Sequence, residues 1–268
     1  MGCCSSRDEG NKEISNTEKF SNEIYKKVEK TLTPSDLDSS KVELQKSLTP
    51  SLSLLLQEAS SLNIKPLSDF HDSHAEYILS YSESIKTWQL VKSVDWMSIE
   101  KIDESEFNKD YPMAHTMKFK SYIPLKLLIE QLNSCEQRPQ WDTHVSSMEI
   151  IKGDIFSEYY LYRTMKILLF SADFVDKKIV AIYGDAVVII GYAAQGIREP
   201  IKGTTRSSTI LSIHKITIEN GVTVMNNYSQ TDANSLMAKA VAKLGPAKLI
   251  EWGRALVKRI ESLNTITQ

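Results

Sequence analysis

The sequence predicts an α+β domain whose antiparallel sheet is covered on both faces or curves around an apolar interior. Two turn signals and one change of spacing predict it. Gly184-Asp185 and Asn220-Gly221 each separate two strand-like runs, and they fit type II′ and type I′ hairpin turns respectively. After Asp232 the apolar residues change from the two-residue spacing of strands to the spacing of an amphipathic helix. A long sheet followed by a C-terminal helix is therefore expected.

The hairpin at Gly184-Asp185 is apolar on both faces. A type II′ turn fixes its register, and the faces follow from that register. One face pairs Lys178 with Gly191, Val180 with Ile189 and Ile182 with Val187, and the other pairs Ile179 with Ile190, Ala181 with Val188 and Tyr183 with Ala186. An antiparallel sheet with one solvated face alternates apolar and polar residues. This sheet must therefore be covered on both sides, or curve around something apolar that need not be protein.

The chain opens with Met1-Gly2-Cys3-Cys4-Ser5-Ser6, which fits the N-myristoylation pattern on Gly2. Cys3 and Cys4 are natural palmitoylation sites beside an acylated glycine, whereas the alternative is a chance N-terminus. One myristoyl chain binds a membrane only marginally, and the six basic and six acidic residues of 1–30 cancel. The second anchoring signal must then be a thioester on Cys3 or Cys4. We expect a peripheral, lipid-anchored protein on the cytoplasmic side of a membrane.

Residues 1–65 are predicted to form a largely disordered tether, and residues 66–268 a folded domain. The tether segment holds twelve serines and only two aromatic residues, which is too little to close a core. Thr49-Pro50 nonetheless fits the start of a short helix. We expect the leucines between Leu52 and Leu56 to pack against the domain, with a partner protein as the alternative.

The domain is predicted to begin with a helix over Asp69–Ser84. Strands over Trp88–Val91, Trp96–Ile102 and Tyr111–Tyr122, a helix over Leu125–Cys135, and strands over Val145–Ile151, Ser157–Lys166 and Asp173–Ala194 follow. The hairpin at Asn220-Gly221 places His214 opposite Asn227. Gly245-Pro246 is expected to divide the last helical segment into Leu236–Leu244 and Ala247–Leu263. The second piece presents Leu249, Trp252 and Leu256 on one face, and the whole segment carries a local net charge of +4.

Composition excludes several classes of function. A formal net charge of −2 gives no reason to expect nucleic acid as a partner. Three cysteines cannot make a disulfide framework, and the longest apolar stretch, Ala186–Ala194, is too short to span a bilayer. His71 and His74 lack a third ligand nearby, so a solvated face is favoured and no metal or cofactor is expected. No catalytic motif is present, and no serine or cysteine at diagnostic spacing completes a triad with His144 and Asp142.

Polar residues on apolar strand faces are the candidate ligand contacts. Lys178 shares its face with Val180 and Ile189, and Arg163 shares one with Tyr159 and Leu161. An inward charge is costly unless it is paired, so these side chains, with His214 and Asn227, are candidates to receive a ligand's polar head. The alternatives are that the charged side chains reach a sheet edge and that His214 is structural. Trp141 is expected in the core, and Arg138 and Asp142 are expected to form a structural pair.

Four short motifs, in their order along the chain, resemble the START lipid-transfer domain. They are Trp88 in Trp88-Gln89-Leu90-Val91, then Arg138-Pro139-Gln140-Trp141-Asp142, then Ser171-Ala172-Asp173-Phe174-Val175, and last Tyr228-Ser229-Gln230-Thr231-Asp232. The resemblance covers roughly Pro66 to Leu263. The chain departs from the family at Ala172, where arginine is usual, and at Ala233-Asn234, where glycine and proline usually follow the late aspartate.

The resemblance implies a helix-grip fold, in which a curved antiparallel sheet wraps around a long C-terminal helix and encloses an apolar cavity. It implies a non-enzymatic monomer that binds one hydrophobic lipid, a sterol, phospholipid or sphingolipid, and transfers it between membranes. The C-terminal helix would act as a gate, with Leu249, Trp252 and Leu256 closing the cavity and its basic residues meeting anionic head groups. The alternatives are a membrane-held sensor or adaptor without transfer activity, and a hydrolase or cyclase of the same fold that uses an acid such as Glu158.

Overall fold

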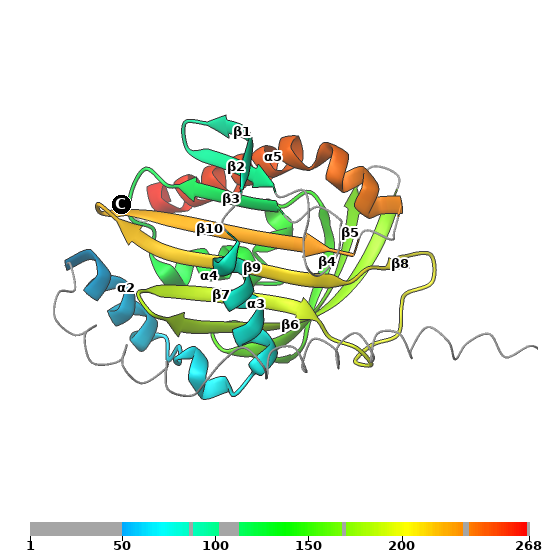
Figure 1. The fold of residues 1–268 in the computed structure, drawn as a ribbon, viewed down its shortest axis with the longest axis horizontal. Coiled ribbons are helices and arrows are strands. Elements are labelled where there is room, and N and C mark those ends of the chain that lie inside the picture. Colours follow the sequence, from blue (N-terminus) through cyan, green and yellow to red (C-terminus); the bar gives the residue numbers. More distant parts are fainter. Residues whose placement is uncertain (1–49, 86–87, 102–112, 168–169, 233–235, 267–268) are drawn as a thin grey trace, which may run out of the picture. The chain divides into compact units, whose positions relative to one another are not determined.

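The computed structural model describes residues 50–85, 88–101, 113–167, 170–232 and 236–266 (Figure 1). Its elements in chain order are α2 (Pro50–Ser61), the 3-10 helix η2 (Leu67–Phe70), α3 (Ser73–Ser84), β1 (Gln89–Val94), β2 (Met97–Lys101), β3 (Met113–Lys118), α4 (Leu125–Asn133), the 3-10 helix η3 (Arg138–Gln140), β4 (Val145–Gly153), β5 (Glu158–Ile167), β6 (Phe170–Tyr183), β7 (Ala186–Ala193), β8 (Thr205–Arg206), β9 (Thr209–Glu219), β10 (Val222–Thr231) and α5 (Leu236–Ile266). None of the described helices combines the length and the hydropathy needed to cross a bilayer.

One sheet organises the domain. Its strands lie in the order β1-β2-β3-β10-β9-β7-β6-β5-β4, and β8 pairs with β6 beside this path. Every pairing along the path is antiparallel, whereas the short β6–β8 pairing is parallel. The α+β class and the curved antiparallel sheet with a C-terminal helix are therefore confirmed.

Both predicted hairpins are present in the predicted register. Lys178 pairs with Gly191 and Ile182 with Val187, while His214 pairs with Asn227. Of the two central residues of the first turn only Gly184 takes a positive φ, 57°, as a type II′ turn requires. In the second turn both Asn220, at 51°, and Gly221, at 79°, take positive φ, as a type I′ turn requires.

The sheet is covered on both faces. The inner face, which carries Val180, Val187 and Ile189, forms one buried cluster with residues of α4 and α5. The outer face, which carries Ala181, Val188 and Ile190, forms a second cluster with residues of α3. In Figure 1 α3 crosses the strands on the near side of the sheet and α4 lies on the far side. The apolar character of both hairpin faces is explained by this double covering.

The compact unit begins at Thr49, earlier than the boundary predicted at residue 66. Leu55 and Ala59 of α2 are buried, at 1% and 0% exposure, and belong to the cluster under the inner face. The helix therefore packs against the domain, as expected for its leucines, although Leu54 stays 39% exposed. The prediction of a disordered tether over the preceding residues lies outside the described residues, and so do Gly2, Cys3 and Cys4.

Two predicted helix boundaries were wrong. The helix expected over Asp69–Ser84 is divided, because His71 takes a left-handed φ of 50° and Asp72 then caps α3 by accepting from the amide of Ala75. The break expected at Gly245-Pro246 does not occur, and α5 continues through Pro246. A proline removes one helical hydrogen bond, and a helix whose apolar residues beyond that point are buried can tolerate this loss.

Candidate functional site

Lys178 lies on the inner face of β6 and is only 4% exposed. Its side chain lies over Gly191 of β7, where an added Cβ would come within 2.6 Å of the Lys178 Nζ. Among the described residues, none forms a hydrogen bond or an ion pair with this ammonium group. Burial lowers the pKa of Lys178 from its ordinary 10.5 to about 7, helped by Arg163 and Arg138 and opposed by Asp176. Of the two orientations that the sequence left open, the structure shows the buried one, and the role of Lys178 as a ligand contact stays a prediction.

Arg163 of β5 also points to the inner face, where it forms an ion pair with Asp176. Its Nη2 lies 3.1 Å from the Asp176 Oδ2, and the same nitrogen donates to the Thr209 hydroxyl at 3.4 Å. The guanidinium carbon lies 4.8 Å from the centre of the Phe174 ring. Asp176 is fully buried and was missed by the sequence reading, although it stands two residues before Lys178 on the same strand face.

His214 and Asn227 face each other across β9 and β10 on the same side of the sheet. The Asn227 side-chain oxygen is hydrogen-bonded to the His214 Nδ1, and its amide donates to the carbonyls of His115 at 3.3 Å and Met225 at 3.1 Å. Burial and the Lys178 ammonium lower the pKa of His214 to about 3, and burial alone does the same for His115. Both imidazoles are therefore neutral at physiological pH. The sequence reading missed His115, whose strand pairs with β10.

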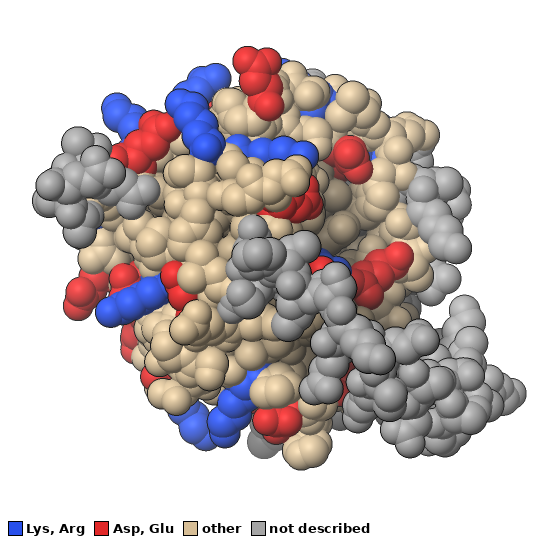
Figure 2. All heavy atoms as spheres, turned by 90° about the vertical axis from the view of Figure 1, so that its left-hand side faces the viewer, with Lys and Arg blue, Asp and Glu red and all other residues tan. Residues whose placement is uncertain are grey.

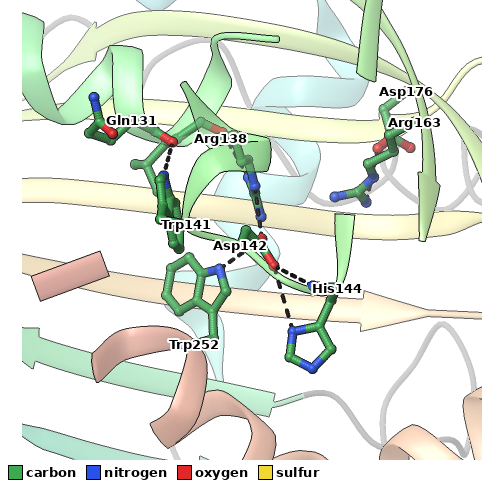
Figure 3. Close-up of polar contacts among 9 residues, drawn as sticks. Gln131, Arg138, Trp141, Asp142, His144, Arg163, Asp176 and Trp252 are labelled. Atoms are coloured by element: carbon green, nitrogen blue, oxygen red, sulfur yellow. Dashed lines mark hydrogen bonds and ion pairs between the residues drawn. The ribbon is translucent and has the colours of Figure 1, made fainter. Parts of the chain in front are cut away.

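Trp252 of α5 is hydrogen-bonded to Asp142, in the segment that follows α4 (Figure 3). Its indole Nε1 donates to the Asp142 Oδ2 at 3.2 Å, and its ring lies 5.8 Å from the Trp141 ring. Arg138 donates to the same carboxylate at 3.0 Å, and the amide of His144 donates to its other oxygen at 3.2 Å. Burial alone would raise the pKa of Asp142, but Arg138 and His144 hold it well below its usual range. The expected Arg138–Asp142 pair and the burial of Trp141 are confirmed.

The apolar residues of α5 predicted to form the gate differ in burial, and its basic residues differ in their partners. Leu256 is fully buried in the cluster under the inner face, and Leu249 is half-buried against it. Arg259, expected to meet head groups, instead donates to the side chains of Gln131, Gln137 and Gln140. Lys248 pairs with Glu251 at 2.6 Å. On the described part of α5, Arg254 and Lys258 remain exposed, and the side chains of Lys239 and Lys243 lie outside the description.

One small pocket lies between Trp252 and the segment from Trp141 to His144. It holds about 30 Å³ and is lined by Trp141, Asp142, Thr143, His144, Glu251, Trp252 and Ala255. Sites for small molecules have volumes of roughly 300–1,000 Å³. The pocket has space for a water molecule and not for an acyl chain.

Glu158, the acid that the enzymatic alternative would use, does not point to the inner face of the sheet. Glu158 alternates with the inward Tyr159 and lies 3.0 Å from Lys177 on the outer side of the sheet. His74 lies edge-on against Tyr192 at 4.6 Å, also on that side. Within the described residues, no group of three histidine, cysteine, aspartate or glutamate side chains is placed to hold a metal ion.

Charges on the face of the domain that carries α2 and the hairpin turns are mixed in sign. Figure 2 shows lysine and arginine side chains interspersed with aspartate and glutamate over a largely uncharged surface. Lys178, by contrast, lies in the interior, and no counter-ion to it is found among the described residues.

The sequence matches no family model and no curated protein. Solved structures do share its architecture. Human StAR-related lipid transfer protein 5 matches with a TM-score of 0.62 at 16% identity, over 79% of this chain and 99% of that chain. Human STARD10 matches with a TM-score of 0.59 at 18% identity, over 72% and 83%. A STAR-related lipid transfer protein from Xanthomonas axonopodis matches with a TM-score of 0.57 at 14% identity, over 66% and 99%.

These identities are low, and what the structures share with this chain is the arrangement of its elements. A curved antiparallel sheet with a C-terminal helix is the arrangement that the sequence resemblance implied. The chain has the fold of a START domain.

Proposed function

We propose that this domain binds a single lipid molecule between the inner face of the sheet and α5, and carries it from one membrane to another without catalysing a reaction. The observation that carries the proposal is Lys178, which is buried on the inner face and has no ion-pair partner among the described residues. A buried charge without a partner costs free energy, and a ligand's polar head would remove that cost. Two of the proteins whose structures share this fold are named as lipid transfer proteins, which supports the same function.

Binding would be driven by the apolar part of the lipid. Each Å² of apolar surface removed from water contributes about 25 cal/mol, so an acyl chain supplies most of the affinity and the polar head sets its orientation. Entry would require α5 to move, because its Leu256 and Ile260 are buried under the inner face. The contact between Trp252 and Asp142 would hold the closed position.

The proposal includes a membrane anchor formed by a fatty amide on Gly2 and a thioester on Cys3 or Cys4. It places the protein as a monomer on the cytoplasmic side of a membrane. Exposed Arg254 and Lys258 on α5 would meet anionic head groups during docking.

The test is lipid transfer by the full chain purified from eukaryotic cells. Native mass spectrometry should detect one co-purified lipid, and the protein should move labelled lipid between vesicles. The variant Arg254→Glu with Lys258→Glu should slow extraction from anionic vesicles at low salt and approach wild type at high salt. Lys65→Glu with Lys152→Glu changes two other exposed lysines and serves as the control. Absence of both bound lipid and transfer would refute the proposal.

A sensor or adaptor is the second candidate, and Leu54 favours it. This side chain is 39% exposed on α2, although its neighbour Leu55 is buried in the domain. In this candidate, Leu54 would contact the partner protein. Bound lipid without transfer between vesicles would support this candidate over the carrier.

A further inference from the structure

The charges on the inner side of the sheet do not balance. Arg138 is paired with Asp142 and Arg163 with Asp176, at 3.0 and 3.1 Å. His115 and His214 are neutral, since their pKa values are about 3. Lys178 remains, and the group as a whole therefore carries one unit of positive charge when this lysine is protonated.

Several polar atoms around Lys178 have no hydrogen-bond partner in the described structure. They are the hydroxyl of Tyr159, the Nε of Arg163 and both carboxylate oxygens of Asp176, one of which lies 3.1 Å from Arg163 in the ion pair. Tyr159 is fully buried and stands directly opposite Lys178 in the pairing of β5 with β6. Buried polar atoms are almost always hydrogen-bonded in folded proteins. Their concentration beside an unpaired ammonium indicates a place for a ligand's polar group.

Small residues continue the inner face beside Lys178. The row of residues that continues across the inner face from Lys178 is Gly191, Ser212 and Ser229, on β7, β9 and β10. All three have small side chains, and both serines are only half-buried. Lys178 extends over Gly191 because that residue has no Cβ to obstruct it.

We infer that the lipid bound by this domain carries one acidic group, a carboxylate or a phosphate, which pairs with the Lys178 ammonium beside the Tyr159 hydroxyl. The inference rests on the proposed lipid-binding function and specifies its ligand. A single anion would neutralise the excess charge and accept hydrogen bonds from Lys178 and Tyr159. A sterol or diacylglycerol, whose hydroxyl is neutral, would leave the lysine uncompensated.

The same geometry makes binding depend on pH. The charged and titratable groups that act on Lys178 are Asp176 on its own strand, Arg163 on β5, His214 on β9 and Arg138 in η3, and Tyr159 stands opposite it on β5. The pKa of Lys178 is about 7 without ligand, and a bound anion would raise it. Affinity should therefore be constant below pH 7 and fall above it, by up to about tenfold per pH unit.

The experiment compares four lipids on the delipidated full chain, oleic acid, phosphatidic acid, dioleoylglycerol and cholesterol, at pH 6.5 and 8.5. Lys178→Met should weaken binding of the acidic lipid about tenfold or more and leave the neutral lipids unchanged. Lys177→Met is the matched control, because it removes the same charge from the outer face of the same strand. Gly191→Ala should weaken acidic lipids by a smaller factor, because the added Cβ displaces the lysine while keeping its charge.

Preference for oleic acid identifies a carboxylate as the source of the acidic group, and preference for phosphatidic acid identifies a phosphate. Either supports the inference. Tighter binding of a neutral lipid, or equal affinity of wild type and Lys178→Met for the acidic lipids, would overturn it while leaving the proposed function intact. Binding of none of the four by wild type would overturn both. Thermal unfolding of each variant confirms that an affinity change is not a loss of fold.

Discussion

Lys177 and Lys178 are neighbours on β6 whose ammonium groups have opposite environments. Lys177 lies on the outer face and pairs with Asp72 at 2.7 Å and Glu158 at 3.0 Å. Burial alone would lower the pKa of Lys177, but these two partners raise it. Lys178 lies on the inner face with no such partner, and burial lowers its pKa to about 7. The same residue type therefore stabilises the fold at one position and destabilises it at the next.

We predict that Lys178→Met stabilises the ligand-free protein. The folded-state pKa of about 7 lies below the ordinary 10.5, so the unfolded state binds more protons between these values. The free energy of unfolding of wild type should rise with pH through this window, and the gain from Lys178→Met should shrink accordingly. At pH 7 the gain should be about 2–4 kcal/mol, whereas Lys177→Met should cost about 1 kcal/mol.

Urea unfolding of both variants and wild type at pH 7 and pH 9.5 measures these differences. A Lys178→Met protein that is less stable than wild type at pH 7 would show that the lysine makes contacts that stabilise the fold. The prediction that it is an uncompensated charge would then be wrong.

The type II′ turn fixes which residues share a strand face with Lys178, but the sequence left open whether its side chain points inward or reaches the sheet edge. His115 was not predicted, since it reaches the site through the pairing of β3 with β10, and it lies 112 residues from Asn227. No local pattern specifies which distant strands become neighbours. The sequence does place the Asp176 carboxylate on the same strand face as Lys178. Its partner, Arg163, could be identified only from the pairing of β5 with β6.

At the scale of elements, α5 is attached to η3 and α4 by specific polar contacts as well as by its apolar face. Trp252 donates to Asp142, and Arg259 donates to three glutamine side chains from Gln131 to Gln140. These contacts cross from the last helix to the segment that carries the motif starting at Arg138. Opening of α5 would have to break them together.

We predict that Trp252→Phe loosens α5 with a small loss of stability, about 1 kcal/mol, because Asp142 keeps its bonds from Arg138 and His144. Trp252→Ala should cost more, about 2–4 kcal/mol, since it also removes a half-buried ring from contact with Trp141. Hydrogen exchange of the amides after Pro246 should be faster in both variants, and transfer should be faster in Trp252→Phe.

The control is Trp88→Phe, which removes an indole that lies 5.9 Å from Tyr228. If exchange in α5 is as slow in Trp252→Phe as in Trp88→Phe, the contact with Asp142 does not hold the helix. The sequence had predicted a break at Pro246 because proline is a strong local signal. Tertiary packing of the helix overrides that signal, and the local pattern contains no information about the packing.

At the scale of the whole molecule, the folded unit and the proposed anchor occupy different parts of the chain. The compact unit starts at Thr49, and Gly2, Cys3 and Cys4 precede it by more than forty residues. If the proposed anchor is present, the domain would be joined to it by this intervening segment. The sequence missed the start of the unit because few aromatic residues precede it, whereas burial of Leu55 and Ala59 depends on the strands that α2 covers.

We predict that Gly2→Ala moves the full chain from the membrane to the soluble fraction of a eukaryotic cell. Cys3→Ala with Cys4→Ala should give a weakly and reversibly bound protein, because one myristoyl chain supports only about 10⁴ M⁻¹ of binding. Ser5→Ala, which keeps the acylation pattern, is the control. Membrane binding of Gly2→Ala equal to wild type would contradict the anchor.

The pairing of β3 with β10 also determines the order in which the sheet can be completed. Thr116 and Asn226 bond to each other across 110 residues of chain. Until β10 has been synthesised, the meander of β1, β2 and β3 has one side without its final neighbour, and closing a loop of this length is slow. The ribosome must make the chain as far as β10 before the two halves of the sheet can join. Only then does α5, which follows β10, have a complete inner face on which to pack.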